Sequence, residues 1–183
     1  MDSATEMTVP ANQEAVRSWD GGKLGLFAGV LSAVVAADLA TKLLIQRTFF
    51  LYEQVSVIGD YVRLTYIHNP GAAFGIQLGP PGYSRFIFLG LTIIALVALA
   101  GMYWVTPARD RVRLSAIALI CAGAIGNLLD RIRSPEGVVD FLDVGIGELR
   151  WPVFNVADIA VTTGAIFLAL SLWREEQRAD GKG

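Results

Sequence analysis

Aspartates in this sequence stand repeatedly beside asparagine, lysine or arginine, inside or next to long apolar runs. Asp38 is followed four positions later by Lys42, a spacing that places both side chains on one face of a helix. The other polar or charged residues inside or next to these apolar runs are Asn69, Asn127, Asp130, Arg131, Asp140, Asn155 and Asp158. Charged groups in a membrane are costly and usually functional, so we expect these residues to form a site.

The sequence lacks the residues for most other hydrolytic chemistry. A zinc or transition-metal site usually recruits histidine or cysteine, and a nucleophilic triad needs a histidine base. This chain has one histidine, His68, and one cysteine, Cys121, which lies within an apolar run. We therefore predict carboxylate chemistry with no metal and no cofactor.

Two aspartates held close in a partly dry site share one proton, because both cannot ionise comfortably. The charged carboxylate then accepts a proton from water, while the protonated one polarises a peptide carbonyl. Asp158 is expected in the first turn of a helix, where the helix dipole favours negative charge. Asp140 lies between Val139 and Phe141, so we expect it to be drier and to hold the proton more often. The pair titrates as a unit.

Four apolar runs have the length needed to cross a bilayer: residues 24–45, 86–105, 114–132 and 156–173. Backbone groups in lipid must be satisfied internally, so these runs predict a polytopic α-helical membrane protein with four transmembrane helices. Alternate helices run in opposite directions, which brings the polar residues above to one membrane surface. Small residues predict close helix packing at Gly25 and Gly29, Ala33 and Ala37, and Gly123 and Gly126.

A strand-rich insert is predicted at about 48–82, within a membrane domain that covers 22–173. Alternating residues favour strands at 49–52 and 61–67, forming a small sheet at the membrane surface. Residues 134–152 form a second loop on the same side, where we expect Asp143 and Glu148 to be solvated acids. Residues 1–21 and 174–183 are predicted to be flexible tails.

Composition agrees with a membrane protein. Of 183 residues, 54% are hydrophobic and 17% charged, against about 25% charged in soluble domains. The net charge of −2 and the lack of a basic stripe exclude nucleic-acid binding. Eight basic residues fall on the side of the termini and seven on the other. Arginines around the short connection at 106–112 favour cytoplasmic termini.

Five segments, taken together and in order, resemble the lipoprotein signal peptidases, also called signal peptidase II. The segments are 38–42 (DLATK), 69–75 (NPGAAFG), 126–131 (GNLLDR), 138–141 (VVDF) and 154–158 (FNVAD). The resemblance covers about 24–173. It implies an aspartic endopeptidase of the bacterial inner membrane with its active site near the periplasmic face.

The resemblance also implies roles for individual residues. Asp140 and Asp158 would be the catalytic pair. Residues that would bind substrate or support the site are Asn69, Gly71, Asn127, Arg131, Asn155, Asp38, Lys42 and Asp130. The segment 49–67 would form a periplasmic cradle, and the stretch after Gly71 a short lid.

The implied substrate is a prolipoprotein whose cysteine carries a diacylglyceryl group, with cleavage just before that cysteine. Globomycin-type peptides would inhibit the enzyme, membrane lipid would surround it, and we expect a monomer. From the residues alone, two alternatives stay open. One is an ion-coupled transporter, because intramembrane acids also relay ions. The other is a non-enzymatic scaffold in which pairs such as Asp38 with Lys42 only position helix ends.

Overall fold

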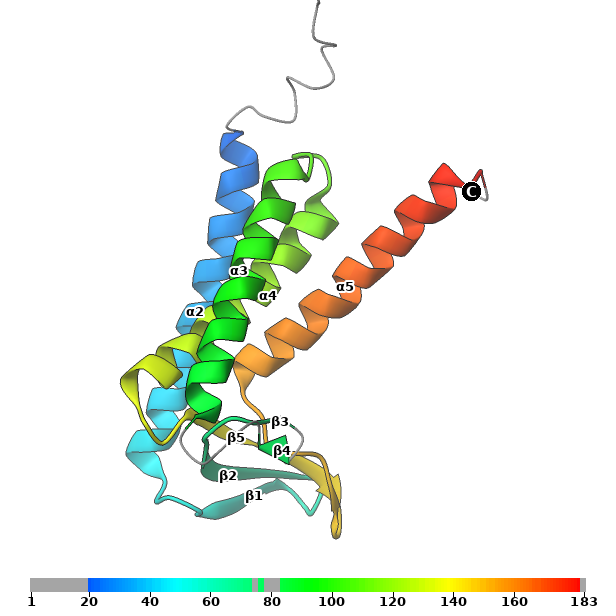
Figure 1. Ribbon diagram of the computed structural model, residues 1–183. Coiled ribbons are helices and arrows are strands. Elements are labelled where there is room, and N and C mark those ends of the chain that lie inside the picture. Colours follow the sequence, from blue (N-terminus) through cyan, green and yellow to red (C-terminus); the bar gives the residue numbers. More distant parts are fainter. Residues whose placement is uncertain (1–19, 74–75, 78–82, 182–183) are drawn as a thin grey trace, which may run out of the picture.

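The computed structural model describes residues 20–73, 76–77 and 83–181. Figure 1 shows the long helices with a small sheet at one end of them. The helices are α2 (Gly21–Thr48), α3 (Ser84–Val105), α4 (Arg111–Arg133) and α5 (Val156–Ala179). All four are long and apolar enough to cross a membrane, which confirms the predicted spans. Helix α5 continues past residue 173, so part of the segment expected to be a tail is helical.

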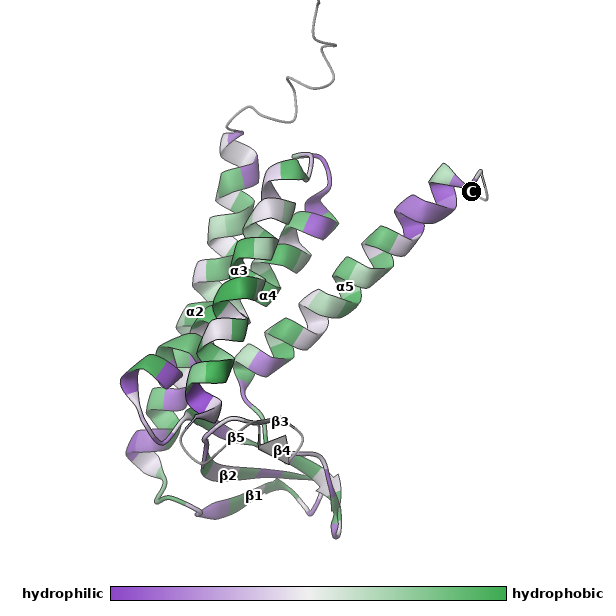
Figure 2. Cartoon of the chain, viewed as in Figure 1, coloured by the Kyte–Doolittle hydropathy of each residue, from purple (hydrophilic) through white to green (hydrophobic). Residues whose placement is uncertain are grey.

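Polar residues define where the helices begin. The Asp20 side chain accepts hydrogen bonds from the backbone N–H groups of Gly22 and Lys23, and Asp110 accepts one from Arg113. Asn155 and Asp158 form a reciprocal capping box at the start of α5. Such caps satisfy N–H groups that have no partner within the helix. Figure 2 shows the apolar residues along the middle of the helices and the polar ones toward their ends and in the sheet.

The sheet has four antiparallel strands in the order β1 (Gln54–Ile58), β2 (Val62–Asn69), β5 (Val138–Ile146) and β6 (Leu149–Arg150). Strand β2 confirms the strand predicted at 61–67. The strand predicted at 49–52 is wrong. There α2 ends and the chain turns, with Phe50 84% exposed and Tyr52 at a φ of 68°. Strand β5 lies in the predicted loop at 134–152.

A second, two-stranded sheet pairs β3 (Ala72–Ala73) with β4 (Ile76–Gln77). It occupies the place of the predicted lid after Gly71. Residues 74–75 and 78–82 of that stretch lie outside the described residues. The lid therefore stays a prediction.

Apolar contacts join the sheet to the helices. Ile45, near the end of α2, packs with Tyr66 of β2 and with Val139 and Phe141 of β5 in one buried cluster. Because these side chains come from one helix and two central strands, the cluster fixes the sheet against the end of α2.

Small residues bring α4 close to its neighbours. A β-carbon added to Gly126 would lie 2.4 Å from Oδ2 of Asp38 on α2, and one added to Gly164 of α5 would lie 2.7 Å from the Ala116 carbonyl oxygen. Close packing is therefore confirmed on α4. The prediction of close packing is wrong for Gly25 and Gly29, where an added β-carbon would meet no atom within 4 Å.

Candidate active site

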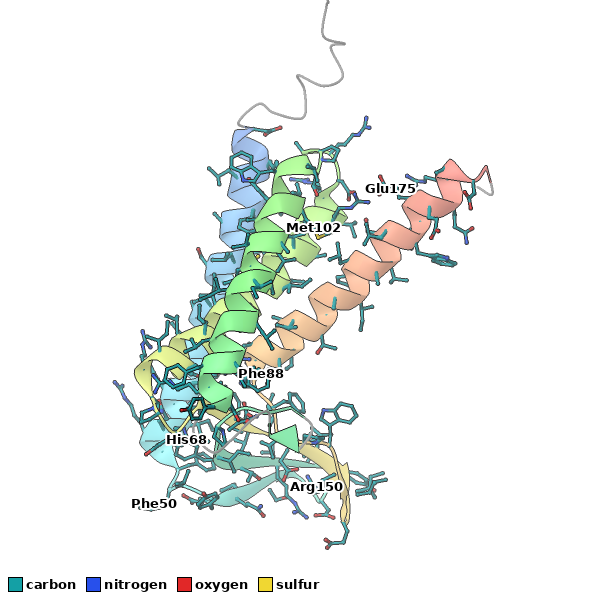
Figure 3. The ribbon with its side chains drawn as sticks, viewed as in Figure 1. Phe50, His68, Phe88, Met102, Arg150 and Glu175 are labelled. Atoms are coloured by element: carbon teal, nitrogen blue, oxygen red, sulfur yellow. The ribbon has the colours of Figure 1, made fainter. Side chains whose placement is uncertain are left out.

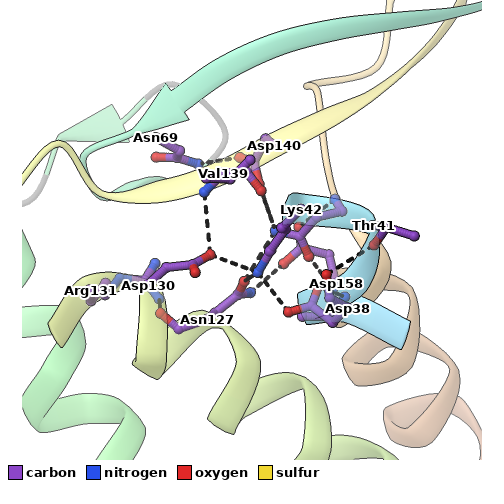
Figure 4. A network of polar contacts seen from close by, with 12 residues as sticks. Asp38, Thr41, Lys42, Asn69, Asn127, Asp130, Arg131, Val139, Asp140 and Asp158 are labelled. Carbon is purple, nitrogen blue, oxygen red and sulfur yellow. Dashed lines mark hydrogen bonds and ion pairs between the residues drawn. The ribbon is translucent and has the colours of Figure 1, made fainter. Parts of the chain in front are cut away.

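The polar residues singled out from the sequence meet where the helices reach the sheet. Figure 4 shows them joined in one network of hydrogen bonds and ion pairs. They come from the C-terminal part of α2, the C-terminal end of α4, the first turn of α5, and strands β2 and β5. Five segments of sequence that are far apart therefore build one site.

Asp140 lies on β5, opposite Ile67 of β2, and is only 2% exposed. Its carboxylate accepts two amide hydrogen bonds, from Nδ2 of Asn69 at 3.1 Å and from Nδ2 of Asn155 at 2.7 Å. Buried carboxylates need such donors. Strand β5 thus places Asp140 between Asn69 and Asn155, and each carboxylate oxygen accepts one of their hydrogen bonds.

Asp158 occupies the first turn of α5. Its Oδ2 accepts a hydrogen bond from the backbone N–H of Asn155 at 3.0 Å, and its Oδ1 accepts one from Nδ2 of Asn127 at 2.8 Å. Asn155 is fully buried. It donates to both carboxylates, from its side chain to Asp140 and from its backbone N–H to Asp158. One residue therefore sets the position of the two acids relative to each other.

Burial raises the pKa of Asp140 to about 7, and the negative charge of Asp158 acts in the same direction. The amide donors Asn69 and Asn155 and the positive charge of Lys42 oppose this shift. A carboxyl with a pKa near neutrality exchanges its proton readily at physiological pH, as an acid-base catalyst must. The sequence predicted that Asp140 is the drier residue, and its burial agrees.

Lys42 belongs to the same network (Figure 4) and is 2% exposed. Its Nζ lies 2.8 Å from Asp38, 2.8 Å from Asp130 and 3.0 Å from Oδ1 of Asn127. Asp38 in turn accepts a hydrogen bond from the backbone N–H of Ala157 at 3.0 Å. This buried group ties α2 to α4 and to the first turn of α5, which is where Asp158 stands.

Arg131 and Gly71 complete the wall of the site. The Arg131 guanidinium lies 5.0 Å from the centre of the Phe88 ring, and its buried Nε has no hydrogen-bond partner among the described residues. Gly71 has a φ of +115°, and a β-carbon there would lie 2.9 Å from the Phe88 ring. The Gly71 N–H donates to Oδ1 of Asn69 at 3.0 Å, which turns the Asn69 amino group toward Asp140.

Two loop acids differ from each other. Asp143, expected to be solvated, is 3% exposed and accepts hydrogen bonds from Nε of Arg150 at 2.6 Å and from the Thr65 hydroxyl at 3.1 Å. That prediction is wrong because β5 carries Asp143 into the sheet, where Arg150 pairs with it. Glu148 is exposed, as predicted.

His68 faces Tyr66 and Glu136, with Nε2 2.9 Å from the Tyr66 hydroxyl and 3.3 Å from the Glu136 carboxylate. Figure 3 shows it near the end of α3 that carries Phe88. Neither of these contacts, within the described residues, joins His68 to Asp140 or Asp158. Within the described residues no group of three or more histidines, cysteines or acids could hold a metal. That the activity is independent of metal stays a prediction.

A groove of about 300 Å³ opens beside Asp158. Its walls are Trp151, Phe154, Ile159, Thr162 and Thr163. Helical spacing explains its wall on α5, because Thr162 lies four positions after Asp158 and Thr163 four positions after Ile159. These residues were not predicted as part of the site, although Thr162 and Thr163 interrupt an otherwise apolar run.

Comparisons with known proteins agree with this geometry. Residues 30–174 match the family model described as "Signal peptidase (SPase) II". The lipoprotein signal peptidase of Geobacter metallireducens is 41% identical over 84% of this chain and 93% of its own length. That of Moorella thermoacetica is 44% identical over 76% of this chain and 87% of its own length.

Solved structures show the same fold. A bacterial membrane enzyme determined at 2.3 Å by the in meso method has a TM-score of 0.75 and 32% identity, covering 85% of this chain and 92% of its own. A second, determined at 1.9 Å, has a TM-score of 0.72 and 34% identity, covering 81% and 93%. By the family match, the relatives and the fold, the chain belongs to the signal peptidase II family of bacterial multi-pass membrane peptidases.

Proposed function

We propose that the chain is a lipoprotein signal peptidase that cleaves its precursors by aspartic catalysis, with Asp140 and Asp158 as the acid-base pair. Family membership supports the reaction. The observation that supports an aspartic mechanism is that Asn155 donates hydrogen bonds to both acids. This bridge holds the buried Asp140 carboxyl beside the partly exposed Asp158 carboxylate. The transporter and scaffold alternatives have no comparable support from the relatives.

In the proposed reaction the two acids enter with one proton between them. The Asp158 carboxylate, which is the more exposed, accepts a proton from the attacking water. Asp140 donates its proton to the scissile carbonyl oxygen, and the water oxygen bonds to the carbonyl carbon. Collapse of this intermediate breaks the C–N bond and delivers a proton to the leaving amine, after which the pair again holds one proton.

Arg131 is proposed to assist this step. Its Nε lies buried without a hydrogen-bond partner among the described residues, and its guanidinium interacts electrostatically with Asp140 and Asp158. A buried donor without a partner costs free energy. A substrate carbonyl oxygen would remove that cost on binding.

The proposed substrate is a prolipoprotein cut just before a diacylglyceryl-modified cysteine. A lipid-anchored precursor remains in the bilayer and reaches the acids sideways, between helices. The groove beside Asp158, walled by Trp151, Phe154 and Ile159, offers apolar surface next to the attacking water. Globomycin-type peptides are proposed to inhibit by occupying the same site.

The proposed location is the bacterial inner membrane, with the sheet and both acids at the periplasmic face. The start of α2 and the end of α5 both lie on the side of the molecule away from the sheet (Figure 1). The termini would then be cytoplasmic. We propose that the active unit is a monomer.

A cleavage assay tests the proposal. Purified protein is mixed with a diacylglyceryl-modified precursor, and Asp140→Asn and Asp158→Asn are compared with the parent. Each variant is expected to lose about 10²- to 10⁴-fold in rate. Asp20→Asn is the matched control, since asparagine also caps a helix and Asp20 lies at the opposite end of α2. Full activity in either site variant would refute the pair.

A further inference from the structure

A second cavity lies at the end of the molecule away from the acids. It has a volume of about 460 Å³ and is bounded by the short connection before α4, the first turn of α4 and the last turns of α5. Figure 1 shows α5 leaning away from the other helices toward its C-terminus. Glu175, on the wall of this cavity, lies far from His68 and Arg150 of the sheet (Figure 3).

The lining carries net positive charge. Four arginines and two acids line the cavity: Arg109, Arg113, Arg174, Arg178, Asp110 and Glu175. Arg113 satisfies both acids, with contacts of 3.3 Å to Asp110 and 2.5 Å to Glu175. Across the part of the chain that the structure describes, none of the other three arginines has an ion-pair partner. Three exposed guanidinium groups thus surround one opening.

An apolar cleft continues from this opening along the two helices. It measures about 420 Å³ and shares Val112, Ser171 and Arg174 with the first cavity. Its further walls include Phe167 and Leu170, which are 45% and 41% exposed. In a membrane such a cleft between helices faces acyl chains, so the arginines stand at headgroup depth above an apolar channel.

We propose that this double cavity binds an anionic phospholipid of the surrounding bilayer. Its phosphate contacts Arg109, Arg174 and Arg178, because guanidinium groups match phosphate oxygens in charge and geometry. One acyl chain lies along Val112, Phe167 and Leu170. Basic pockets between transmembrane helices recognise anionic headgroups in this way. The site lies in the leaflet opposite to the acids and does not depend on the proposed peptidase reaction.

Native mass spectrometry of the full chain tests the proposal. The protein is released from micelles that contain equimolar phosphatidylglycerol and phosphatidylcholine with identical acyl chains. We expect phosphatidylglycerol to be retained preferentially, and Arg174→Gln with Arg178→Gln to reduce that preference about fivefold for each arginine removed. Val112→Trp, which fills the cleft, is expected to lower the retention of both lipids.

The matched control is Arg47→Gln with Arg133→Gln, two exposed arginines at the sheet end of α2 and α4. The control is expected to keep the full preference. The proposal is overturned if the Arg174 and Arg178 variant keeps it, or if the control loses it equally. Displacement of the lipid by millimolar inorganic phosphate would overturn the lipid site and show that the arginines bind a free anion. A dimer that dissociates in the variant would assign the cavity to a second copy of the chain.

Discussion

Gly123 on α4 lies directly against Ala157 on α5. A β-carbon on Gly123 would stand 2.2 Å from the Ala157 carbonyl oxygen and 2.7 Å from a methyl group of Val161. Ala157 is the neighbour of Asp158 in the first turn of α5. The small size of Gly123 therefore sets how close Asp158 comes to Asn127 on the same α4 helix.

We expect Gly123→Ala to destabilise the protein by about 1–3 kcal/mol, because the added methyl group overpacks a helix contact that has no free space. It should also slow cleavage by moving Asp158. Gly101→Ala on α3 is the control, since no atom lies within 4 Å of its added β-carbon and alanine is favoured in helices by about 0.5–1 kcal/mol. Thermal unfolding and cleavage rate check both. Equal effects of the two substitutions would contradict this account.

Asn155→Ser separates helix capping from positioning of the acids. Serine also caps helices well, but its shorter side chain cannot reach Asp140 as the Asn155 amide does at 2.7 Å. We expect Asn155→Ser to keep most of the stability and lose most of the activity. Asn155→Ala should lose about 1 kcal/mol of stability in addition. Full cleavage by the serine variant would show that the bridge is dispensable.

The cleavage rate should fall as pH rises through about 7. At that pH Asp140, whose pKa is raised to about 7 by burial and by Asp158, loses the proton that it donates in the proposed reaction. Asn69→Ala removes a hydrogen bond that favours the ionised form, so the fall should move to higher pH. Rates measured from pH 5 to 9 for both proteins check the direction. A shift to lower pH would exclude this assignment.

The same pKa predicts how stability changes with pH. Since the folded pKa of Asp140 lies above its ordinary value of 3.8, the folded state binds more protons between these values. The contribution of Asp140 is therefore fully present below pH 3.8 and is lost as pH rises through about 7. Asp158→Asn removes the neighbouring charge and should flatten this slope in thermal unfolding between pH 4 and 8. An unchanged slope would mean that Asp158 does not act on Asp140.

Arg150→Ala should destabilise the sheet, because it leaves the buried Asp143 carboxylate without its cation. Removing one partner of a buried pair costs about 3–5 kcal/mol, and the partial exposure of Arg150 places this case at or below the lower end. Arg150→Ala combined with Asp143→Ala should cost less than Arg150→Ala alone. Unfolding curves in detergent measure both. A larger loss in the double variant would contradict the pairing.

The long helices could be predicted because an apolar run of sufficient length in a membrane has few other solutions. The strands could not be predicted as well. Phe49 to Tyr52 read as a strand from their side chains alone, yet Phe50 is exposed and no strand pairs there. Strand β5 depends on pairing with β2, a contact between residues far apart in sequence, so its apolar start gave no sign of the buried Asp143.

The members of the site were predictable and their connections were not. Asp140, Asp158 and Asn155 stand out because polar residues are rare beside apolar runs. That Asn155 joins the two acids depends on how β5 meets the start of α5. Asp38 pairs with Lys42 as its spacing suggests, but its second partner is the backbone N–H of Ala157, and backbone groups carry no sequence signal. Spacing likewise could not show that Gly25 and Gly29 face no other helix.

The acids, the sheet and the groove beside Asp158 all lie at one end of the bundle. The proposed enzyme can therefore cleave on one side of the membrane only. A precursor whose modified cysteine sat in the other leaflet would lie at the end that carries the arginine-lined cavity, away from Asp140 and Asp158. Cleavage would then report that a precursor has completed its passage across the bilayer. The fold would thus discriminate between translocated and untranslocated lipoproteins without reading any further sequence.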